Sequence, residues 1–336
     1  MNELLEWSRQ AGGFSGVEGL AIEPVSGDAS FRTYHRLTGI EPTVIAVNSP
    51  PATEKNREFV AISALLRQAG VCAPEVLAVD YDRGFMLLSD LGNRLLLPEL
   101  CGHTVDAYYR QAMDALAHIQ RADVDSGGWT LSPYSPALLE QEMSLLPEWF
   151  LTGLLEMTLS SADRALLTDT FGALIRSAQE QPQVFVHRDY HSRNLMLLDD
   201  GGLGVIDFQD AVVGPVTYDL VSLLRDCYVA WAPDRVTAWA LEFRDHAGLE
   251  VSDEVFKRWF DWMGLQRHLK VLGIFARLWL RDGKPGYLQD LPLVMHYTLS
   301  VAASYAQTAE FAGWFEQRVV PLARAQTWYR EAEIRV

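Results

Sequence analysis

The segment over residues 184–208 restricts the possible folds of this chain more than any other. It starts as a short apolar strand and passes into a polar loop that carries His187, Asp189 and Asn194. Near its end stands Asp207, a further carboxylate, which directly follows another apolar run. A histidine and an aspartate alone are common in turns, because Asp and Asn favour them. The full ordered set is rarely accidental.

Two short apolar runs, 195–198 and 203–206, flank an Asp-Asp-Gly-Gly turn. This pattern predicts a β-hairpin, since Asp and Gly are residues that such turns favour. The hairpin places Asp207 at the end of its second strand. We therefore expect the oxygen-bearing side chains of Asp189, Asn194 and Asp207 to meet in one cleft.

These residue types suit phosphoryl transfer. That reaction needs hard oxygen ligands that hold Mg²⁺ on the phosphates, and a carboxylate that aligns the attacking hydroxyl and takes its proton. Asp189 fits the second task, and Asn194 with Asp207 fits the first. His187, at the exit of the strand, is expected to brace the loop by hydrogen bonding.

The hydrophobic pattern predicts two lobes of different character. Residues 1–90 predict a small β-rich lobe around one helix, and residues 91–336 predict a larger, mainly helical lobe that contains the loop and the hairpin. Together they make an α+β, bilobal fold. The clearest expected strands are 20–25, 31–36, 43–47, 76–79 and 85–88, and the clearest helices are 53–69, 105–121 and 162–178.

At these residues the chain resembles the aminoglycoside phosphotransferase and choline kinase family, a branch of the protein-kinase-like fold. The likeness is carried by the H-R-D-x-x-x-x-N order of residues 187–194, by Asp207 after the hairpin and by the helix start at Asp219. It implies ATP as the phosphoryl donor, Mg²⁺ as the metal, and a structural role for Asp219 in steadying the loop.

Within this family the chain is similar to the anomeric sugar kinases of peptidoglycan recycling. Residues 26–32, 187–194, 204–215 and 223–226 carry this likeness. It implies ATP-dependent phosphorylation of the C1 hydroxyl of N-acetylmuramate and N-acetylglucosamine in cell-wall recycling. An aminoglycoside, a choline-like amine or homoserine is the alternative acceptor. A nucleotide-binding pseudokinase is the alternative outside the enzymes.

The chain departs from the protein-kinase pattern in how it would neutralise phosphate. The third strand, within residues 43–48, has no lysine where protein kinases place the one that binds the α- and β-phosphates. Arg32 is the candidate to replace it, since a guanidinium can bind two phosphate oxygens at once. A solvated strand arginine is the alternative. The turn that would cover the phosphates holds Gly27 and Ser30, whose backbone amides and hydroxyl suit that task.

The remaining candidate ligands come from position in the chain. Ser89 and Asp90 follow the fifth strand, where kinases have the hinge whose backbone meets adenine. A polyhydroxylated acceptor needs convergent polar groups. Arg225 is suited to a substrate carboxylate, although pairing with a neighbouring aspartate is an equal alternative. The predicted sugar ligands are Tyr190, Asp210, Arg225 and Asp226.

The composition limits which binding partners and which cellular compartment are expected for this protein. The net charge of −16, with only four lysines, repels a polyanion and excludes nucleic acid as an expected partner. Cys72, Cys101 and Cys227 are far apart and odd in number, which favours reduced thiols and a cytoplasmic protein. No apolar run is long enough to span a membrane. Family analogy favours a monomer.

Overall fold

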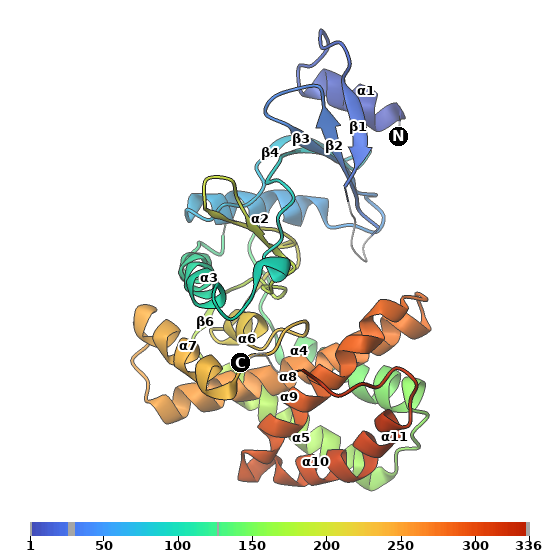
Figure 1. The fold of residues 1–336 in the computed structure, drawn as a ribbon, viewed down its shortest axis with the longest axis vertical. Coiled ribbons are helices and arrows are strands. Elements are labelled where there is room, and N and C mark those ends of the chain that lie inside the picture. Colours follow the sequence, from blue (N-terminus) through green and yellow to red (C-terminus); the bar gives the residue numbers. More distant parts are fainter. Residues whose placement is uncertain (1, 26–30, 126–127, 334–336) are drawn as a thin grey trace. The chain divides into compact units, whose positions relative to one another are not determined.

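Five short strands near the start of the chain form one antiparallel sheet in the order β1-β2-β3-β5-β4 (Figure 1). The computed structural model describes residues 2–25, 31–125 and 128–333. Two of the three interior strands, β3 and β5, are mostly apolar and almost wholly buried, as their β-branched and aliphatic residues favour. The strands are β1 (Ala21–Pro24), β2 (Thr33–Thr38), β3 (Val44–Asn48), β4 (Val76–Asp80) and β5 (Phe85–Ser89).

Two helices accompany this sheet. Helix α1 (Asn2–Ala11) buries Leu4 and Trp7 against the strands, and the rings of Trp7 and Phe85 lie 5.7 Å apart. Helix α2 (Asn56–Gln68) buries an apolar stripe of residues at helical spacing. The α1 packing was not predicted, because its short amphipathic pattern includes only a few apolar residues.

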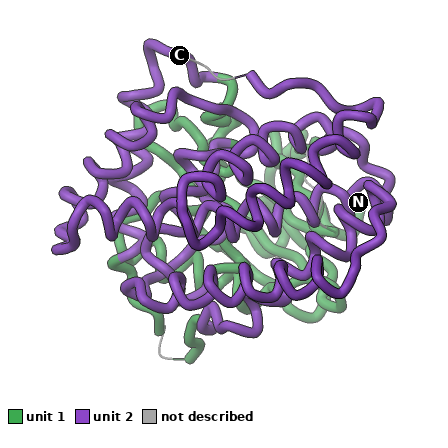
Figure 2. The backbone as a smooth tube through the Cα atoms, turned by 90° about the horizontal axis from the view of Figure 1, so that it is seen from below, with its two compact units in different colours: residues 1–98, 121–131, 193–211 green, residues 99–120, 132–192, 212–336 purple. Residues whose placement is uncertain are grey.

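The chain divides into two compact units (Figure 2). The first unit also contains the hairpin of β7 (Leu195–Leu197) and β8 (Leu203–Val205). Each unit is made of three separate stretches of the chain, so this division does not test the predicted boundary between lobes after residue 90, which stays a prediction. The first unit comprises Met1–Pro98, Arg121–Leu131 and Arg193–Ala211, and the second comprises Glu99–Gln120, Ser132–Ser192 and Val212–Val336.

The second unit is mainly helical. Its longest helix, α8 (Asp253–Leu280), has 28 residues, most of them buried, and packs against α5, α6 and α9. A two-stranded sheet, β6 (Gln183–Val186) paired with β9 (Val212–Pro215), leads into the loop at His187. The helices are α3 (Val105–Gln120), α4 (Pro136–Met143), α5 (Ser161–Glu180), α6 (Tyr218–Leu224), α7 (Pro233–His246), α8, α9 (Leu291–Ala303), α10 (Ala309–Trp314) and α11 (Val320–Arg324), with stretches of π-helix at Leu146–Leu154 and Phe315–Val319.

The predicted α+β class is confirmed, and most element limits agree within a few residues. The second strand begins at Thr33 rather than Phe31, because Phe31 is 71% exposed and Arg32 points into the interior ahead of the ladder. Helix α2 begins at Asn56 rather than residue 53, because Thr53 and Glu54 both donate to the carbonyl of Pro50 in a turn. Within the described part of the chain, no helix is long and apolar enough to cross a membrane.

Candidate active site

The hairpin of the first unit brings the two predicted metal ligands together. Its register pairs Leu195 with Val205, and the amide of Ile206 donates to the carbonyl of Asn194 at 3.1 Å. Because Asn194 precedes one strand and Asp207 follows the other closely, their side chains meet. The Nδ2 of Asn194 donates to Oδ2 of Asp207 at 3.3 Å.

A cavity of about 370 Å³ opens beside this pair, within the first unit. Asn194 and Asp207 form part of its polar lining. Ile45, Leu88 and Met196 contribute apolar walls. A pocket of this size, mostly apolar with a few placed polar groups, is suited to a flat organic ring that carries a polar extension.

Ser89 and Asp90 line the same cavity, but their side chains are occupied. The carboxylate of Asp90 accepts from Nε and NH2 of Arg36, at 2.5 and 2.9 Å, and from the hydroxyl of Thr43 at 2.8 Å. Burial alone would raise the pKa of Asp90, but the bonds from Arg36, Gly92 and Thr43 lower it. The hydroxyl of Ser89 accepts from the amide of Glu75. The two side chains therefore fix the segment, and nucleotide binding by its backbone stays a prediction.

Arg32 is buried rather than solvated, with 1% of its surface exposed. Its Nε donates to Oγ of Ser49 at 2.9 Å, one NH2 lies 3.2 Å from the carboxylate of Glu54, and the guanidinium stacks over Phe59. The alternative of a solvated strand arginine is therefore wrong. Phosphate binding by Arg32 stays a prediction. Gly27 and Ser30, predicted to cover the phosphates, lie outside the described residues.

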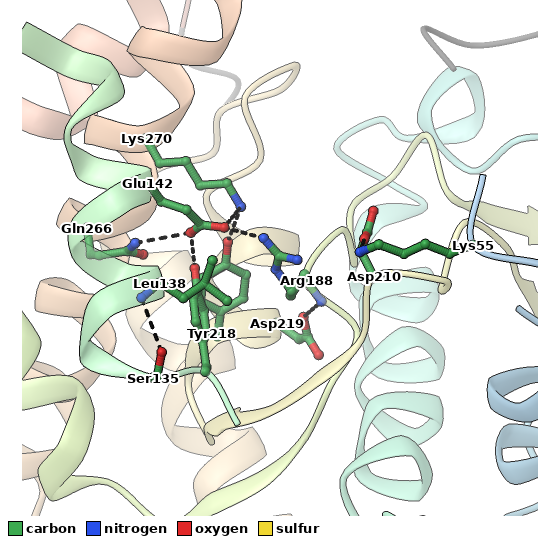
Figure 3. Close-up of polar contacts among 11 residues, drawn as sticks. Lys55, Ser135, Leu138, Glu142, Arg188, Asp210, Tyr218, Asp219, Gln266 and Lys270 are labelled. Carbon is green, nitrogen blue, oxygen red and sulfur yellow. Dashed lines mark hydrogen bonds and ion pairs between the residues drawn. The ribbon is translucent and has the colours of Figure 1, made fainter. Parts of the chain in front are cut away.

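Asp210 forms an ion pair with Lys55. The Nζ of Lys55 lies 2.6 Å from Oδ1 of Asp210, and both side chains are exposed (Figure 3). The pair links the residue before α2 to the segment after Asp207. Its aspartate was predicted to bind the sugar, and that role stays a prediction.

In the second unit, Asp219 holds the start of the loop. Its buried carboxylate accepts from the amides of His187 and Arg188, at 2.6 and 3.0 Å, which confirms its predicted structural role. Burial raises the pKa of Asp219, and the two hydrogen bonds offset only part of this effect. The resulting pKa is about 7. Arg188 has a φ of 75°, a left-handed conformation that side chains disfavour. His187 is fully buried, and its Nδ1 accepts from the amide of Asp189 at 3.2 Å, the bracing that was expected.

Asp189 is partly exposed, and its surroundings keep it ionised. Burial would raise the pKa of its carboxyl, but the charges of Lys270, His191 and Arg188 outweigh burial and lower the pKa. An ionised carboxylate at neutral pH can accept a hydrogen bond from an alcohol and then its proton. The geometry therefore suits Asp189 to act as a base.

A second buried aspartate, Asp226, holds the end of the loop. It is fully buried and accepts from the amide and the hydroxyl of Ser192, at 3.0 and 2.5 Å, and from the amide of Tyr228 at 3.1 Å. Tyr190 is also fully buried, and its hydroxyl donates to the carbonyl of Ala112. Both were predicted to bind sugar. That role stays a prediction, and their burial does not favour it.

Arg225 pairs with Asp261 rather than with its neighbour Asp226. One NH2 of Arg225 lies 2.6 Å from Oδ1 of Asp261, and the guanidinium stacks over Phe260. The side chain keeps 15% of its surface exposed. Binding of a substrate carboxylate by Arg225 stays a prediction.

Two charged residues behind the loop, Glu142 on α4 and Lys270 on α8, were not predicted from the sequence. Figure 3 shows Glu142 among Lys270, Arg188 and Gln266. Glu142 and Lys270 stand 46 residues before and 82 residues after Arg188 in the sequence, so no local motif connects them. The sequence around Lys270 did contain a signal, because polar and charged residues interrupt an apolar run there. Such residues need partners if the helix is buried.

The structure thus groups the candidate residues in two sets. Asn194 and Asp207 lie together in the first unit, and His187, Asp189 and Asp219 lie together in the second. The chain joins the sets directly, because Asp189 and Asn194 are five residues apart in the sequence.

The donor set beside the cavity fits Mg²⁺. One amide and one carboxylate are hard ligands, and Mg²⁺ is usually held by one or two carboxylates together with phosphates and water. No group of three or more His, Cys, Asp or Glu residues suited to a metal occurs in the described ranges. A site completed by the phosphates of a nucleotide is the kind that these two residues support.

Comparison with known proteins places the chain in one family. The family model described as "Phosphotransferase enzyme family" matches residues 21–256. An N-acetylmuramate/N-acetylglucosamine kinase of Pseudomonas aeruginosa is 43% identical over 305 residues, which cover 89% of each chain. A protein of the same name from Pseudomonas putida is 42% identical over 86% of each chain.

Solved structures support the same fold. The ethanolamine kinase of Plasmodium vivax superposes with a TM-score of 0.64 at 10% identity, covering 87% of each chain. An aminoglycoside phosphotransferase with ADP bound superposes with a TM-score of 0.59 at 13% identity, covering 89% of this chain and 98% of that one. These neighbours confirm the predicted bilobal, protein-kinase-like fold. From the extent of the family match and the identity to its relatives, we conclude that the chain belongs to the phosphotransferase enzyme family.

Proposed function

We propose that this protein is a kinase that transfers the γ-phosphoryl group of ATP to the C1 hydroxyl of N-acetylmuramate or N-acetylglucosamine, giving a sugar 1-phosphate in cell-wall recycling. One observation carries the choice of substrate: the 43% identity, over 89% of the chain, to a protein named N-acetylmuramate/N-acetylglucosamine kinase. The C1 position and the pathway rest on the motif resemblance of residues 187–194 and 204–215 to the anomeric sugar kinases.

The proposed chemistry is direct, in-line transfer without a phosphoenzyme. Asp189 orients the sugar hydroxyl, and its ionised carboxylate accepts the proton as the oxygen attacks the γ-phosphorus. The bond from that phosphorus to the bridging oxygen breaks on the opposite side, and ADP leaves with the electron pair. His187 and Asp219 keep the loop in the conformation that aims Asp189. Because the charges around Asp189 lower the pKa of its carboxyl, the base is already in its reactive form at neutral pH.

The metal and nucleotide are assigned to the first unit. Asn194 and Asp207 would hold Mg²⁺, which supplies positive charge to the phosphates when it is bound. The base and ribose of ATP are assigned to the adjoining cavity, beside the segment of Ser89 and Asp90. Arg32 and the turn with Gly27 and Ser30 are assigned to the phosphates, and Tyr190, Asp210, Arg225 and Asp226 to the region of the sugar.

A product analysis tests this proposal. The purified protein is incubated with Mg²⁺, ATP and a panel of sugars, amines and homoserine, and ATP consumption is measured for each. With an N-acetylated amino sugar labelled with ¹³C at C1, we expect a phosphorus–carbon coupling at C1 in the NMR spectrum. A phosphorylated product with no phosphorus coupling at the labelled C1 would reject the C1 assignment. ATP consumption with an aminoglycoside, a choline-like amine or homoserine, and with no amino sugar, would reject the substrate.

A further inference from the structure

Glu142 lies at the centre of a buried polar cluster in the second unit (Figure 3). Its side chain is 8% exposed, and four side chains converge on its two oxygens. Oε1 accepts from a guanidinium NH2 of Arg188 and lies 3.1 Å from Nζ of Lys270. Oε2 accepts from the hydroxyl of Tyr134 and, at 3.5 Å, from Nε2 of Gln266.

Lys270 is held as firmly as Glu142. Its ammonium donates to the hydroxyl of Tyr218 at 3.1 Å and leaves only 9% of its side chain exposed. The charge of Lys270 is also the largest of those that lower the pKa of Asp189. Lys270 therefore pairs with Glu142, and its charge also helps to lower the pKa of the candidate base.

Arg188 connects this cluster to the loop at two points. Asp219 accepts the hydrogen bond of its backbone amide, at 3.0 Å, and Glu142 binds its guanidinium. The backbone of Arg188 has a φ of 75°, an unfavourable conformation that these two contacts help to maintain. Asp189 is the next residue, and any rotation at Arg188 moves its carboxylate.

Stability alone does not account for such a cluster. A buried ion pair loses so much hydration that apolar side chains of the same volume commonly give an equally stable core. A carboxylate saturated by four side-chain donors does, however, fix each donor in one place. The arrangement of Glu142 is therefore suited to positioning.

We propose that Glu142, acting through Arg188 and Lys270, is the positioning residue that holds the carboxylate of Asp189 in its reactive orientation. This inference rests on the proposed function of Asp189 as the base. Glu142 itself touches neither the substrate nor the reacting atoms.

The test is Glu142→Gln, which keeps the shape and removes the charge. A glutamine can still accept from Arg188, and the hydroxyl of Tyr134 can rotate to accept from its amide, so we expect the variant to fold. We expect kcat to fall about 10- to 100-fold, as for other residues that orient a catalytic group, with KM for ATP within about twofold of wild type. Lys270→Met is expected to give a loss of the same size. The double variant should lose little more than the worse single one, because the two residues act as a unit.

The matched control is Glu242→Gln, since Glu242 also pairs with an arginine, Arg110, but at the surface of the second unit. It should leave kcat unchanged. A Glu142→Gln enzyme with kcat within about twofold of wild type and a lower melting temperature would overturn the proposal. So would failure of both Glu142→Gln and Lys270→Met to fold, because the cluster would then be an element of stability.

Acceptor-independent ATP hydrolysis separates this inference from the proposed function. If the wild-type protein phosphorylates no sugar, the same variants are compared by their release of phosphate to water. The expected 10- to 100-fold loss then still supports a positioning role for Glu142, while the choice of sugar fails. If Asp189→Asn abolishes turnover and Glu142→Gln does not lower it, only the inference fails.

Discussion

Arg188 and Asp207 share a backbone conformation that residues other than glycine rarely adopt. Their φ angles are 75° and 65°, and such a conformation costs of order 1–3 kcal/mol unless the surroundings enforce it. Asp219 and Glu142 hold Arg188 at both ends, and Asn194 contacts the carboxylate of Asp207. Two of the three such conformations in the described residues thus occur where a side chain has to be aimed, one before the candidate base and one at a candidate metal ligand. The third, Glu156 with a φ of 52°, belongs to neither set of candidate residues.

Substitution of Asp189 by asparagine tests the candidate base. Asparagine has nearly the same shape but does not take up a proton at neutral pH. We expect kcat to fall roughly 10²- to 10⁴-fold, the usual contribution of a positioned base. KM for ATP should change little, because the cavity is lined by other residues. Steady-state measurement of ADP release checks this, and wild-type turnover would remove Asp189 from the mechanism.

Substitution of Asp207 by asparagine tests the candidate metal site. The change removes one negative charge from the donor set, so we expect the Mg²⁺ concentration for half-maximal activity to rise about tenfold or more. Asp199→Asn is the matched control, because Asp199 is an exposed carboxylate at the tip of the same hairpin. Equal Mg²⁺ requirements in the two variants would show that Asp207 is not a ligand.

The candidate metal ligands could be predicted from the sequence because they lie close together in it. Asn194 and Asp207 are brought together by a hairpin whose turn and apolar runs are visible in the sequence. Glu142 and Lys270 were not predictable in this way. Their approach to the loop depends on how α4 and α8 pack in the second unit, and periodicity gives the face of a helix but not its neighbour.

At the scale of elements, the start of α5 is fixed by a reciprocal cap. The hydroxyl of Ser160 accepts from the amide of Asp163, and Asp163 accepts from the amide of Ser160. The same carboxylate accepts from Nε1 of Trp314 at 2.7 Å and from a guanidinium nitrogen of Arg318 at 2.5 Å. Asp163 therefore joins α5 to the helical segment at 309–319.

Replacing Asp163 with asparagine should lower the free energy of unfolding by about 1–2 kcal/mol at neutral pH, the range for loss of a cap. Burial raises the pKa of Asp163, but the bonds from Ser160, Trp314 and Arg318 outweigh burial and lower it to about 2. Because the folded pKa lies below the unfolded one, the stabilisation is full above about pH 4 and is lost as the pH falls toward 2.

Urea unfolding at several pH values measures this difference. The gap between the wild-type protein and Asp163→Asn should close between about pH 4 and pH 2. Asp169→Asn, an exposed position on the same helix, should show no gap at any pH. A gap for Asp163→Asn that is constant over this range would contradict the role of its charge.

Element limits were less predictable than element types. The second strand starts two residues later than its pattern indicates, because the long side chain of Arg32 finds Ser49 and Glu54 in the interior. Helix α5 starts one residue earlier than residue 162, because its cap is Ser160. In each case a contact distant in sequence, or a cap, decides where the regular backbone begins.

At the scale of the whole molecule, the cavity assigned to the nucleotide belongs entirely to the first unit as far as its described lining is concerned. We therefore expect Mg²⁺ with ADP to slow hydrogen exchange chiefly in that unit, in β5 and the segment to Asn93 and in the hairpin around Asp207. Peptide-resolved mass spectrometry measures this. Mg²⁺ alone is the control and should protect little. Protection centred on the second unit would place the nucleotide elsewhere.

One short stretch of chain supplies both anchors of the loop that carries Asp189. Asp219, in the first turn of α6, holds the loop's first residues, and Asp226, just beyond α6, holds Ser192 near its end. A residue inserted within α6 would turn one anchor by about 100° relative to the other. The lengths of helix and loop are therefore coupled, and we expect insertions and deletions to be tolerated in the Asp-Asp-Gly-Gly turn but excluded from residues 219–226.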